Sequence, residues 1–390
     1  MIATPDYDPV YPGVNVEYDA PIAMDDGVQL RADIYRPADA QGRTVEEKLP
    51  VIVVPTSYTK LLAAINSAIV DGVPTGTIID SVVQAVDPVL SNSALDGVNN
   101  LLQAIPGGAT QLGLGLDKRI VRQGFVQVVV DIRGQGNSPG DYVTLQDGRE
   151  RRDAADLVEW ARTQPWSTGH VGMVGVSYLG STAMEAAVMK PAGLDAIVPI
   201  EPALDLGGLA NEGGMVNQIT GPYYTALLAL RLLPPFSNIL SGQYDAQWLA
   251  SRIKNPLDQL GDAWRTNLGQ GPGTVTGDMH FWQDRKIDMN QVRNIAAKTL
   301  LIGGWRDILV GQYADVYRSL DLPAGQKQLL IGDWTHANLS SGLGKGPGIP
   351  PIYRNLILAW FERWLKGDPN RIEEQGPVTL YQLGGSWTTT

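Results

Sequence analysis

The chain contains no cysteine. Disulfide bonds, thiolate nucleophiles, cysteine-based zinc sites and cysteine-ligated iron–sulfur clusters are therefore excluded. Basic residues are also scarce, since 30 lysines and arginines stand against 41 acidic residues and leave a net charge of −11. Phosphate recognition needs clustered positive charge, so this balance argues against a nucleic-acid partner and against electrostatic docking on anionic lipid.

Long apolar runs and targeting signals are absent as well. No run of about 18 apolar residues occurs, so no segment is expected to span a membrane. Residues 1–10 have neither the basic nor the apolar region that is typical of a signal peptide. These absences predict a soluble protein, with a cytoplasmic location favoured over a secreted one.

Apolar residues are plentiful, at 44% of the chain against 18% charged residues, which is enough for a large packed core. Short runs rich in valine, isoleucine and leucine are typical of buried strands. They are residues 49–55, 125–131, 170–176, 194–200, 299–303 and 328–332. Helical patterns such as 150–164 separate most of these runs. The alternation predicts an α/β fold with a mostly parallel central sheet, whose ligands bind beyond the C-terminal ends of its strands.

Two regions interrupt the alternation of strands and helices. Residues 61–115 carry apolar positions at helical spacing and are interpreted as a lid-like insertion. Residues 203–290 lie between two predicted sheet strands, where we expect an inserted and mainly helical cap. The predicted core consists of residues 1–202 and 291–375, and residues 376–390 follow it.

A serine occupies the turn between a predicted strand and a predicted helix, in Gly175-Val176-Ser177-Tyr178-Leu179-Gly180. This context is typical of a nucleophile elbow, a tight turn that lifts a serine hydroxyl above the sheet. The segment departs from the usual G-x-S-x-G pattern, because Leu179 stands where the second glycine is normally found. An incidental serine at a strand–turn–helix junction is the alternative interpretation. Ser177 is the candidate nucleophile.

Only three histidines are available as the base that a serine nucleophile requires. His170 opens the predicted strand that leads to Ser177, so it lies at the wrong end of the sheet. His280 lies in the cap region, where a packing or surface role is expected. His336 follows the last predicted core strand, at the same edge of the sheet as Ser177. His336 is therefore the candidate base.

The acid that orients the histidine is expected after an earlier strand, in the chain order serine, acid, histidine. Asp307 meets this condition, because it comes a few residues after the predicted strand 299–303. Asp333 competes for the role, but it is too close to His336 in sequence to face the imidazole correctly. The sequence therefore predicts a triad of Ser177, His336 and Asp307 on an α/β-hydrolase fold with an inserted cap.

Several motifs, taken together, resemble those of the cocaine esterase-like hydrolases, a family related to the X-prolyl dipeptidyl peptidases and the α-amino-acid ester hydrolases. Besides the segment around Ser177, they are Pro55-Thr56-Ser57-Tyr58, Asp131-Ile132-Arg133-Gly134, Phe281-Trp282, Gly303-Gly304-Trp305-Arg306-Asp307, Trp334-Thr335-His336 and Trp360-Phe361. The resemblance covers roughly residues 14–367 apart from 61–115. It implies the same triad, and an oxyanion hole formed by the backbone N–H of Tyr178 and the phenol of Tyr58.

The C-terminal part departs from the family pattern. Members of this family commonly carry a C-terminal jelly-roll domain, and here only residues 377–383 could form the first strand of one. The sequence therefore suggests either a truncated form or an unusually short member. Near the site, Asp131 and Arg133 are interpreted as structural residues that hold loops in place.

These observations predict a hydrolase of carboxylic esters that acts on a small molecule through an acyl-enzyme, with no metal or organic cofactor implied. An apolar acyl group would fit if the lid-like insertion lines the pocket. An X-prolyl dipeptidyl peptidase or an α-amino-acid ester hydrolase is the first alternative, in which Glu201, Asp205 and Glu212 could bind the substrate ammonium group. A catalytically idle hydrolase fold used for binding is a second alternative. The insertion could also form the interface of a homo-oligomer.

Overall fold

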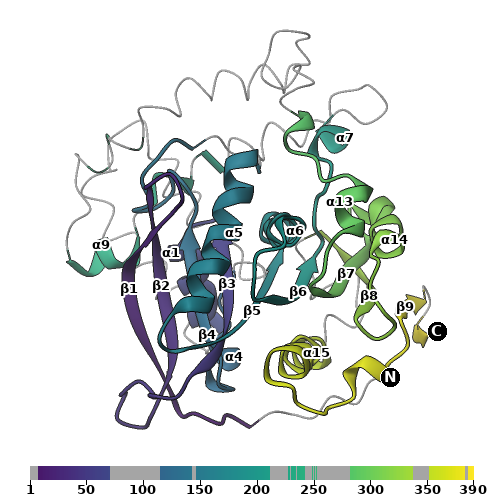
Figure 1. The fold of residues 1–390 in the computed structure, drawn as a ribbon, viewed down its shortest axis with the longest axis horizontal. Helices are drawn as coiled ribbons and strands as arrows, with labels where there is room; N and C mark the ends of the chain where they lie inside the picture. The colour runs from purple at the N-terminus through teal and green to yellow at the C-terminus, as the bar shows by residue number, and fades with distance from the viewer. Residues whose placement is uncertain are drawn as a thin grey trace.

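A ten-stranded sheet runs through the part of the chain that the computed structural model describes (Figure 1). The described residues are 8–70, 115–142, 146–210, 227–228, 230–233, 235–241, 248, 250, 252, 282–336, 351–382 and 385–390. The order of the strands is β1-β2-β4-β3-β5-β6-β7-β8-β9-β10. In Figure 1 they succeed one another from the purple β1 to the yellow β9.

The strands and helices have the following bounds, and the predicted helix at 150–164 corresponds to α5 (Gly148–Thr163). The strands are β1 (Gly13–Ala23), β2 (Gln29–Ala38), β3 (Leu49–Thr56), β4 (Val126–Asp131), β5 (Ser167–Val176), β6 (Leu194–Ile200), β7 (Lys298–Arg306), β8 (Lys327–Thr335), β9 (Val378–Gln382) and β10 (Ser386–Thr389). The longer helices are α1 (Lys60–Val70), α5 (Gly148–Thr163), α6 (Tyr178–Met189), α14 (Val310–Ser319) and α15 (Pro351–Phe361). The shorter ones are α4 (Lys118–Arg122), α7 (Leu206–Ala210), α9 (Phe236–Ser241), α13 (Met289–Arg293), the π-helical turn η3 (Glu362–Lys366) and the 3₁₀ turn η4 (Ile372–Glu374).

The strands from β4 to β9 pair in parallel, and antiparallel strands flank them on both sides. On one side, β1 and β2 form an antiparallel pair and β2 joins β4 in antiparallel orientation. On the other side, β10 runs antiparallel to β9. All six predicted core strands are present, some of them a few residues longer than expected. The prediction of an α/β fold with a mostly parallel sheet is confirmed.

Helices cover both faces of the parallel strands, which is why these strands are apolar at nearly every position. All eight residues of β3 are buried. Val51 and Val53 pack in the same cluster as the apolar residues of α5, α6 and α14. Ile52 and Val54 point to the opposite face, where α1 and α15 contribute to a second cluster. The sheet is therefore a rigid support for whatever follows its strands.

The C-terminal part of the chain belongs to this same core. Trp360 and Phe361 are fully buried, and a Cβ at Gly172 of β5 would lie only 2.7 Å from the ring of Phe361. This tryptophan–phenylalanine motif therefore packs α15 against the sheet. β9 pairs with β8 in parallel. The segment that the sequence offered as the first strand of a further domain thus extends the central sheet.

Several predicted features lie outside the described residues. They include residues 71–114 of the lid-like insertion, most of 211–281 in the cap, and His280. The lid, the cap and the domain boundaries drawn around them stay predictions. Within the part of the chain that is described, no helix combines the length and apolar character needed to cross a bilayer.

Candidate active site

Five polar side chains lie just beyond the C-terminal ends of five parallel strands. They are Tyr58 after β3, Ser177 after β5, Glu201 after β6, Asp307 after β7 and His336 after β8. Parallel strands end at the same edge of the sheet, so residues far apart in the sequence meet there. All four candidates for nucleophile, base, acid and phenolic donor are in this set.

The turn at Ser177 has the strained geometry of a nucleophile elbow. The residue has φ 58° and ψ −118°, and α6 begins directly after it. Such a backbone conformation costs on the order of 1–3 kcal/mol, so it persists only where the surroundings hold it. Here the N–H of Ser177 donates to the carbonyl of Ile200 at the end of β6, over 2.8 Å. The turn leaves the Ser177 side chain almost covered, with 9% of the residue exposed.

Close helix packing explains why the second glycine of the elbow is Gly180 and not residue 179. A Cβ at Gly180 would lie 2.7 Å from the carbonyl oxygen of Ile200 and 2.9 Å from that of Gly175. Leu179 instead fills the space beside Gly175, where an added Cβ would be 2.2 Å from the Leu179 Cβ. The departure from G-x-S-x-G therefore keeps the glycine at the position that contacts β6.

Gly180→Ala is expected to lower the free energy of unfolding by about 1–3 kcal/mol, because backbone atoms must move to admit the methyl group. Gly311→Ala is the matched control, since a Cβ there meets nothing within 4 Å. In the helix α14 that change is expected to be neutral or stabilising by up to about 1 kcal/mol. Urea unfolding of both variants measures the difference. Equal effects on the two proteins would contradict the packing argument.

His336 connects the nucleophile to the acid. Its Nε2 lies 2.7 Å from Ser177 Oγ, and its Nδ1 lies 2.8 Å from Asp307 Oδ1. A carboxylate only accepts, so this contact places the proton of a neutral imidazole on Nδ1 and leaves Nε2 free to accept from the serine. The structure thus brings together the three residues that the sequence singled out.

Asp307 is held by neighbours that the sequence reasoning missed. Its Oδ1 also accepts the N–H of Leu309 at 3.0 Å, and its Oδ2 accepts the hydroxyl of the buried Tyr313 on α14. Gly303 makes room for that tyrosine, because a Cβ there would lie 2.3 Å from its ring. The available signal was a tyrosine six residues after Asp307, between two predicted strands. The competing Asp333 is paired with Arg306 at 3.1 Å.

Tyr178 has a backbone N–H at the start of α6 and a side chain that is held by buried hydrogen bonds. As the first residue of α6 it has no partner for its N–H within the helix. Its hydroxyl donates to the buried Glu150 at 2.5 Å and accepts the N–H of Gln146 at 3.1 Å. Burial raises the pKa of Glu150 to about 8. The ring of Tyr58 meets the Tyr178 ring edge-on, with centroids 6.4 Å apart.

Asp131 and Arg133 hold loops, as the sequence suggested. Asp131 accepts the N–H of Lys60 at 2.8 Å, two residues beyond Tyr58. The ammonium group of Lys60 is itself buried among the carboxylates of Asp19, Asp33 and Asp131. Burial raises the pKa of Asp131 to about 6. Arg133 binds Asp153 on α5 through its Nε at 2.6 Å. The contacts of Lys60 with Asp131 and the other two carboxylates fix the loop that carries Tyr58.

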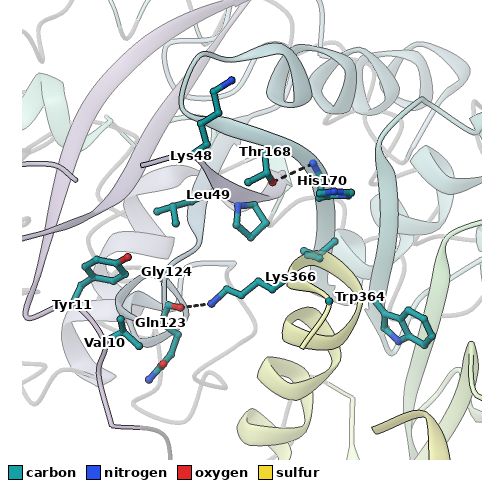
Figure 2. Close-up of a pocket in the computed structure, with 13 residues that line it drawn as sticks. Val10, Tyr11, Lys48, Leu49, Gln123, Gly124, Thr168, His170, Trp364 and Lys366 are labelled. Atoms are coloured by element: carbon teal, nitrogen blue, oxygen red, sulfur yellow. Dashed lines mark hydrogen bonds between the residues drawn. The ribbon is translucent and has the colours of Figure 1, made fainter. Parts of the chain in front are cut away.

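A cavity of about 670 Å³ lies at the other end of the sheet, near the starts of β3 and β5. Figure 2 shows Lys48, His170 and Lys366 among its lining residues. His170 contacts Asp195 at 2.7 Å, and the Lys366 ammonium donates to the carbonyl of Gln123. Two of the three basic side chains that line the cavity therefore already have partners. Because Ser177 follows the opposite end of β5, this cavity is separate from the candidate active site.

The cluster of Glu201, Asp307 and His336 also has the ligand types of a metal site. One atom from each of the three residues lies within 4.8 Å of the others. A metal ion at Nδ1 would need the lone pair of that nitrogen. The contact with Asp307 instead requires a proton there. The two uses exclude one another, and the second imidazole nitrogen, Nε2, accepts the hydrogen bond from the Ser177 hydroxyl.

Comparison with known proteins places this geometry in context. A cocaine esterase from Rhodococcus sp. (strain MB1 Bresler) is 26% identical over 385 residues, which cover 93% of this chain and 57% of that relative. A CocE/NonD family hydrolase from Staphylococcus aureus superposes with a TM-score of 0.64 at 20% identity, over 96% of this chain and 55% of that one. An α-amino acid ester hydrolase gives a TM-score of 0.61 at 19% identity, over 100% of this chain and 61% of that one.

These structural similarities show the α/β-hydrolase fold. The chain spans a little more than half the length of the curated relative and of each of the two structures. The profile of the X-Pro dipeptidyl-peptidase (S15) family matches residues 26–338, which include Tyr58, Ser177, Asp307 and His336. That match extends over most of the sequence. The chain therefore belongs to the X-Pro dipeptidyl-peptidase (S15) family.

Proposed function

We propose that this chain is a serine carboxylesterase that cleaves small-molecule esters through an acyl-enzyme. The observation that carries the proposal is the hydrogen-bonded path from Ser177 through His336 to Asp307, with distances of 2.7 and 2.8 Å. A serine hydroxyl becomes an effective nucleophile when a base adjoins it and a third group orients that base. The similarity to a cocaine esterase supports the choice of an ester as substrate.

Each member of the proposed triad has one task. Ser177 Oγ attacks the acyl carbon while His336 Nε2 takes its proton, and Asp307 stabilises the imidazolium that forms. The imidazolium then returns this proton to the leaving alcohol as the tetrahedral intermediate collapses. A water molecule, deprotonated by the same nitrogen, attacks the acyl-enzyme and releases the carboxylic acid. Ser177 regains its proton in that last step.

The proposed oxyanion hole combines the backbone N–H of Tyr178 with the phenol of Tyr58. The N–H of Tyr178 lies at the start of α6, where the helix dipole also favours negative charge. The phenol of Tyr58 belongs to the loop after β3 that Lys60 and Asp131 hold. Donors fixed before the reaction stabilise developing charge at little further cost. The anchoring of Tyr178 by Glu150 supports such a fixed arrangement.

The contacts of the acidic residues after β6 favour an ester over a substrate with a free ammonium group. Glu201 is fully buried and its carboxylate lies near His336 Nδ1. Asp205 is paired with Lys286 at 2.7 Å. Two of the three carboxylates considered for ammonium binding are thus turned to other partners, and Glu212 lies outside the described residues.

A comparison of substrates and a covalent probe tests the proposal. We expect a fluorophosphonate to label the wild-type protein but not Ser177→Ala. We also expect p-nitrophenyl esters of small acids to be hydrolysed with a kcat/KM at least about 100-fold above that for a free-amine aminoacyl-proline p-nitroanilide, since the latter needs ammonium contacts to bind. Liquid chromatography and absorbance at 405 nm follow the products.

Two outcomes would replace the proposal with its alternatives. Faster cleavage of the aminoacyl-proline amide than of every ester would identify a dipeptidyl peptidase. The absence of both labelling and turnover in a folded protein would identify a binding protein on a hydrolase fold. Increasing the acyl length from acetyl to decanoyl also tests whether the predicted lid at 61–115 favours apolar acyl groups.

A further inference from the structure

Glu201 is a buried carboxylate at the centre of the candidate site with no role in the triad. It follows β6, the strand between the one that leads to Ser177 and the one that leads to Asp307. None of its surface is exposed. Its Oε2 lies 3.7 Å from His336 Nδ1, the same nitrogen that Asp307 approaches at 2.8 Å. Two carboxylates therefore face one imidazole nitrogen.

The backbone at Glu201 is held in an unfavourable conformation. Its φ is +48°, in the left-handed region that residues with a Cβ rarely adopt. Its N–H donates to the carbonyl of Ile302 at 2.7 Å. Farther on, Ser181 Oγ accepts the N–H of Ala203 at 2.8 Å and donates to the carbonyl of Ser177 at 3.1 Å. The loop that carries Glu201 is thus tied to β7 and to the elbow itself.

A buried carboxylate is costly unless a positive charge or hydrogen bonds compensate for its lost hydration. In the proposed reaction, positive charge appears on His336 when it takes the serine proton. At 3.7 Å the contact is too long for a hydrogen bond, so Glu201 acts on the imidazole mainly through its charge. A negative charge at this distance favours the imidazolium over the neutral ring.

Among the described residues, the charged groups near His336 on β7, β8 and α14 have partners of their own. Asp307 accepts from Tyr313 on α14 as well as facing the imidazole. On β7 and β8, Arg306 is paired with Asp333. Among the described residues, Asp307 and Glu201 are the carboxylates in ion-pair distance of the imidazole.

We propose that Glu201 is a second positioning carboxylate for His336. It shares with Asp307 the stabilisation of the imidazolium, and it accepts the hydrogen bond from Nδ1–H when Asp307 is removed. The inference rests on the proposed function, in which His336 is the base. Asp307 provides the direct hydrogen bond. Glu201 adds charge at the same nitrogen and a nearby acceptor within a small movement of the side chain.

Glu201→Gln keeps the shape of the side chain and removes its charge. A neutral His336 is the active form of the base, and the negative charge of Glu201 favours the protonated form. Without that charge, the acid limb of the kcat/KM–pH profile is expected to move down by about one pH unit. The plateau kcat is expected to fall by roughly threefold to tenfold, since the imidazolium loses one of two stabilising charges. Stopped-flow hydrolysis of p-nitrophenyl acetate from pH 4.5 to 9 measures both.

Asp333→Asn is the matched control, because it removes a carboxylate near His336 in sequence that faces Arg306 instead. Its acid limb is expected to stay where the wild-type limb lies. Glu201→Asp keeps the charge and is expected to keep the limb within about 0.3 units. An unmoved limb in Glu201→Gln, or an equal shift in Asp333→Asn, would overturn the inference, since a merely structural role predicts no selective change in the pH profile.

A double-mutant cycle tests whether Glu201 replaces Asp307 as the hydrogen-bond acceptor of Nδ1–H. Asp307→Ala is expected to lose less than the roughly 10⁴-fold typical of a triad acid, because Glu201 still accepts from Nδ1. In that background Glu201→Gln is expected to cost at least about ten times more than it costs alone, since neighbouring residues couple. Equal factors in the two backgrounds would refute the shared role.

The design separates this inference from the proposed function. If Ser177→Ala keeps full activity and fluorophosphonate labelling, the triad itself is wrong. If Ser177→Ala is inactive but Glu201→Gln behaves as wild type at every pH, only the role of Glu201 is wrong. Thermal unfolding monitors the fold of each variant. If Glu201→Gln fails to fold, the cycle is run with Glu201→Asp. Its shorter side chain lies farther from Nδ1, so this change is also expected to cost more activity in the Asp307→Ala background than alone.

Discussion

Ser177→Ala is expected to lower kcat by roughly 10⁴- to 10⁶-fold while the melting temperature changes little. The variant loses the atom that would form the acyl-enzyme, and it loses the 2.7 Å contact with His336 Nε2. The backbone hydrogen bond from residue 177 to Ile200 stays, so the elbow keeps its support. Initial rates of p-nitrophenyl acetate hydrolysis and differential scanning fluorimetry measure the two quantities.

His336→Ala is expected to cost about as much, and the double variant little more, because the members of a triad act as one unit. His170→Ala is the control, since this histidine also has a carboxylate partner at 2.7 Å but lies at the opposite end of the sheet. It is expected to leave kcat unchanged. A loss in His170→Ala or His280→Ala that equals the loss in His336→Ala would mean that the base has been misidentified.

Tyr58→Phe is expected to lower kcat by roughly 10²- to 10³-fold, which corresponds to about 3–4 kcal/mol of transition-state stabilisation. The change removes one donor and keeps the ring, so the edge-on contact with Tyr178 is retained. KM is expected to change little, because the donor binds the oxyanion more strongly than the ground-state carbonyl. Steady-state kinetics on one acetyl ester separates the two parameters.

Tyr317→Phe makes the same chemical change on α14, where the tyrosine ring lies beside Lys327, the first residue of β8, at the opposite end of that strand from His336. Its kcat is expected to match that of the wild-type protein. A decrease of less than about threefold in Tyr58→Phe would show that this phenol does not reach the oxyanion. An increase in KM at constant kcat would instead assign Tyr58 to substrate binding.

The positions of the main site residues could be predicted because each directly follows a strand. Buried parallel strands have a clear apolar signature, and their C-terminal ends meet at one edge of the sheet. That reasoning selected His336 over His170, whereas Asp307 was preferred to Asp333 because Asp333 is too close to His336 in sequence. The structure places Asp307 and His336 2.8 Å apart. Asp333 is turned to Arg306.

Other features depend on three-dimensional detail that no sequence pattern contains. Tyr313 reaches Asp307 only because Gly303 leaves space for its ring. Glu201 was considered as a partner for a substrate ammonium group, but its left-handed backbone directs it toward His336. The glycine at 180 reflects how closely α6 approaches the end of β6. Each of these depends on packing between elements that are distant in the chain.

The hydrogen bond between Ser177 and His336 joins residues that are 159 positions apart. Parallel strands make few local contacts, so the ends that carry these residues approach one another only when the long-range pairing of the sheet is complete. The elbow has the same requirement, because its strained turn is held by the carbonyl of Ile200 on the neighbouring strand. Helices such as α5 form from local contacts, whereas the environment of the reactive serine requires the pairing of β5 with β6, β7 and β8. Recovered activity is therefore expected to report the assembly of these four strands.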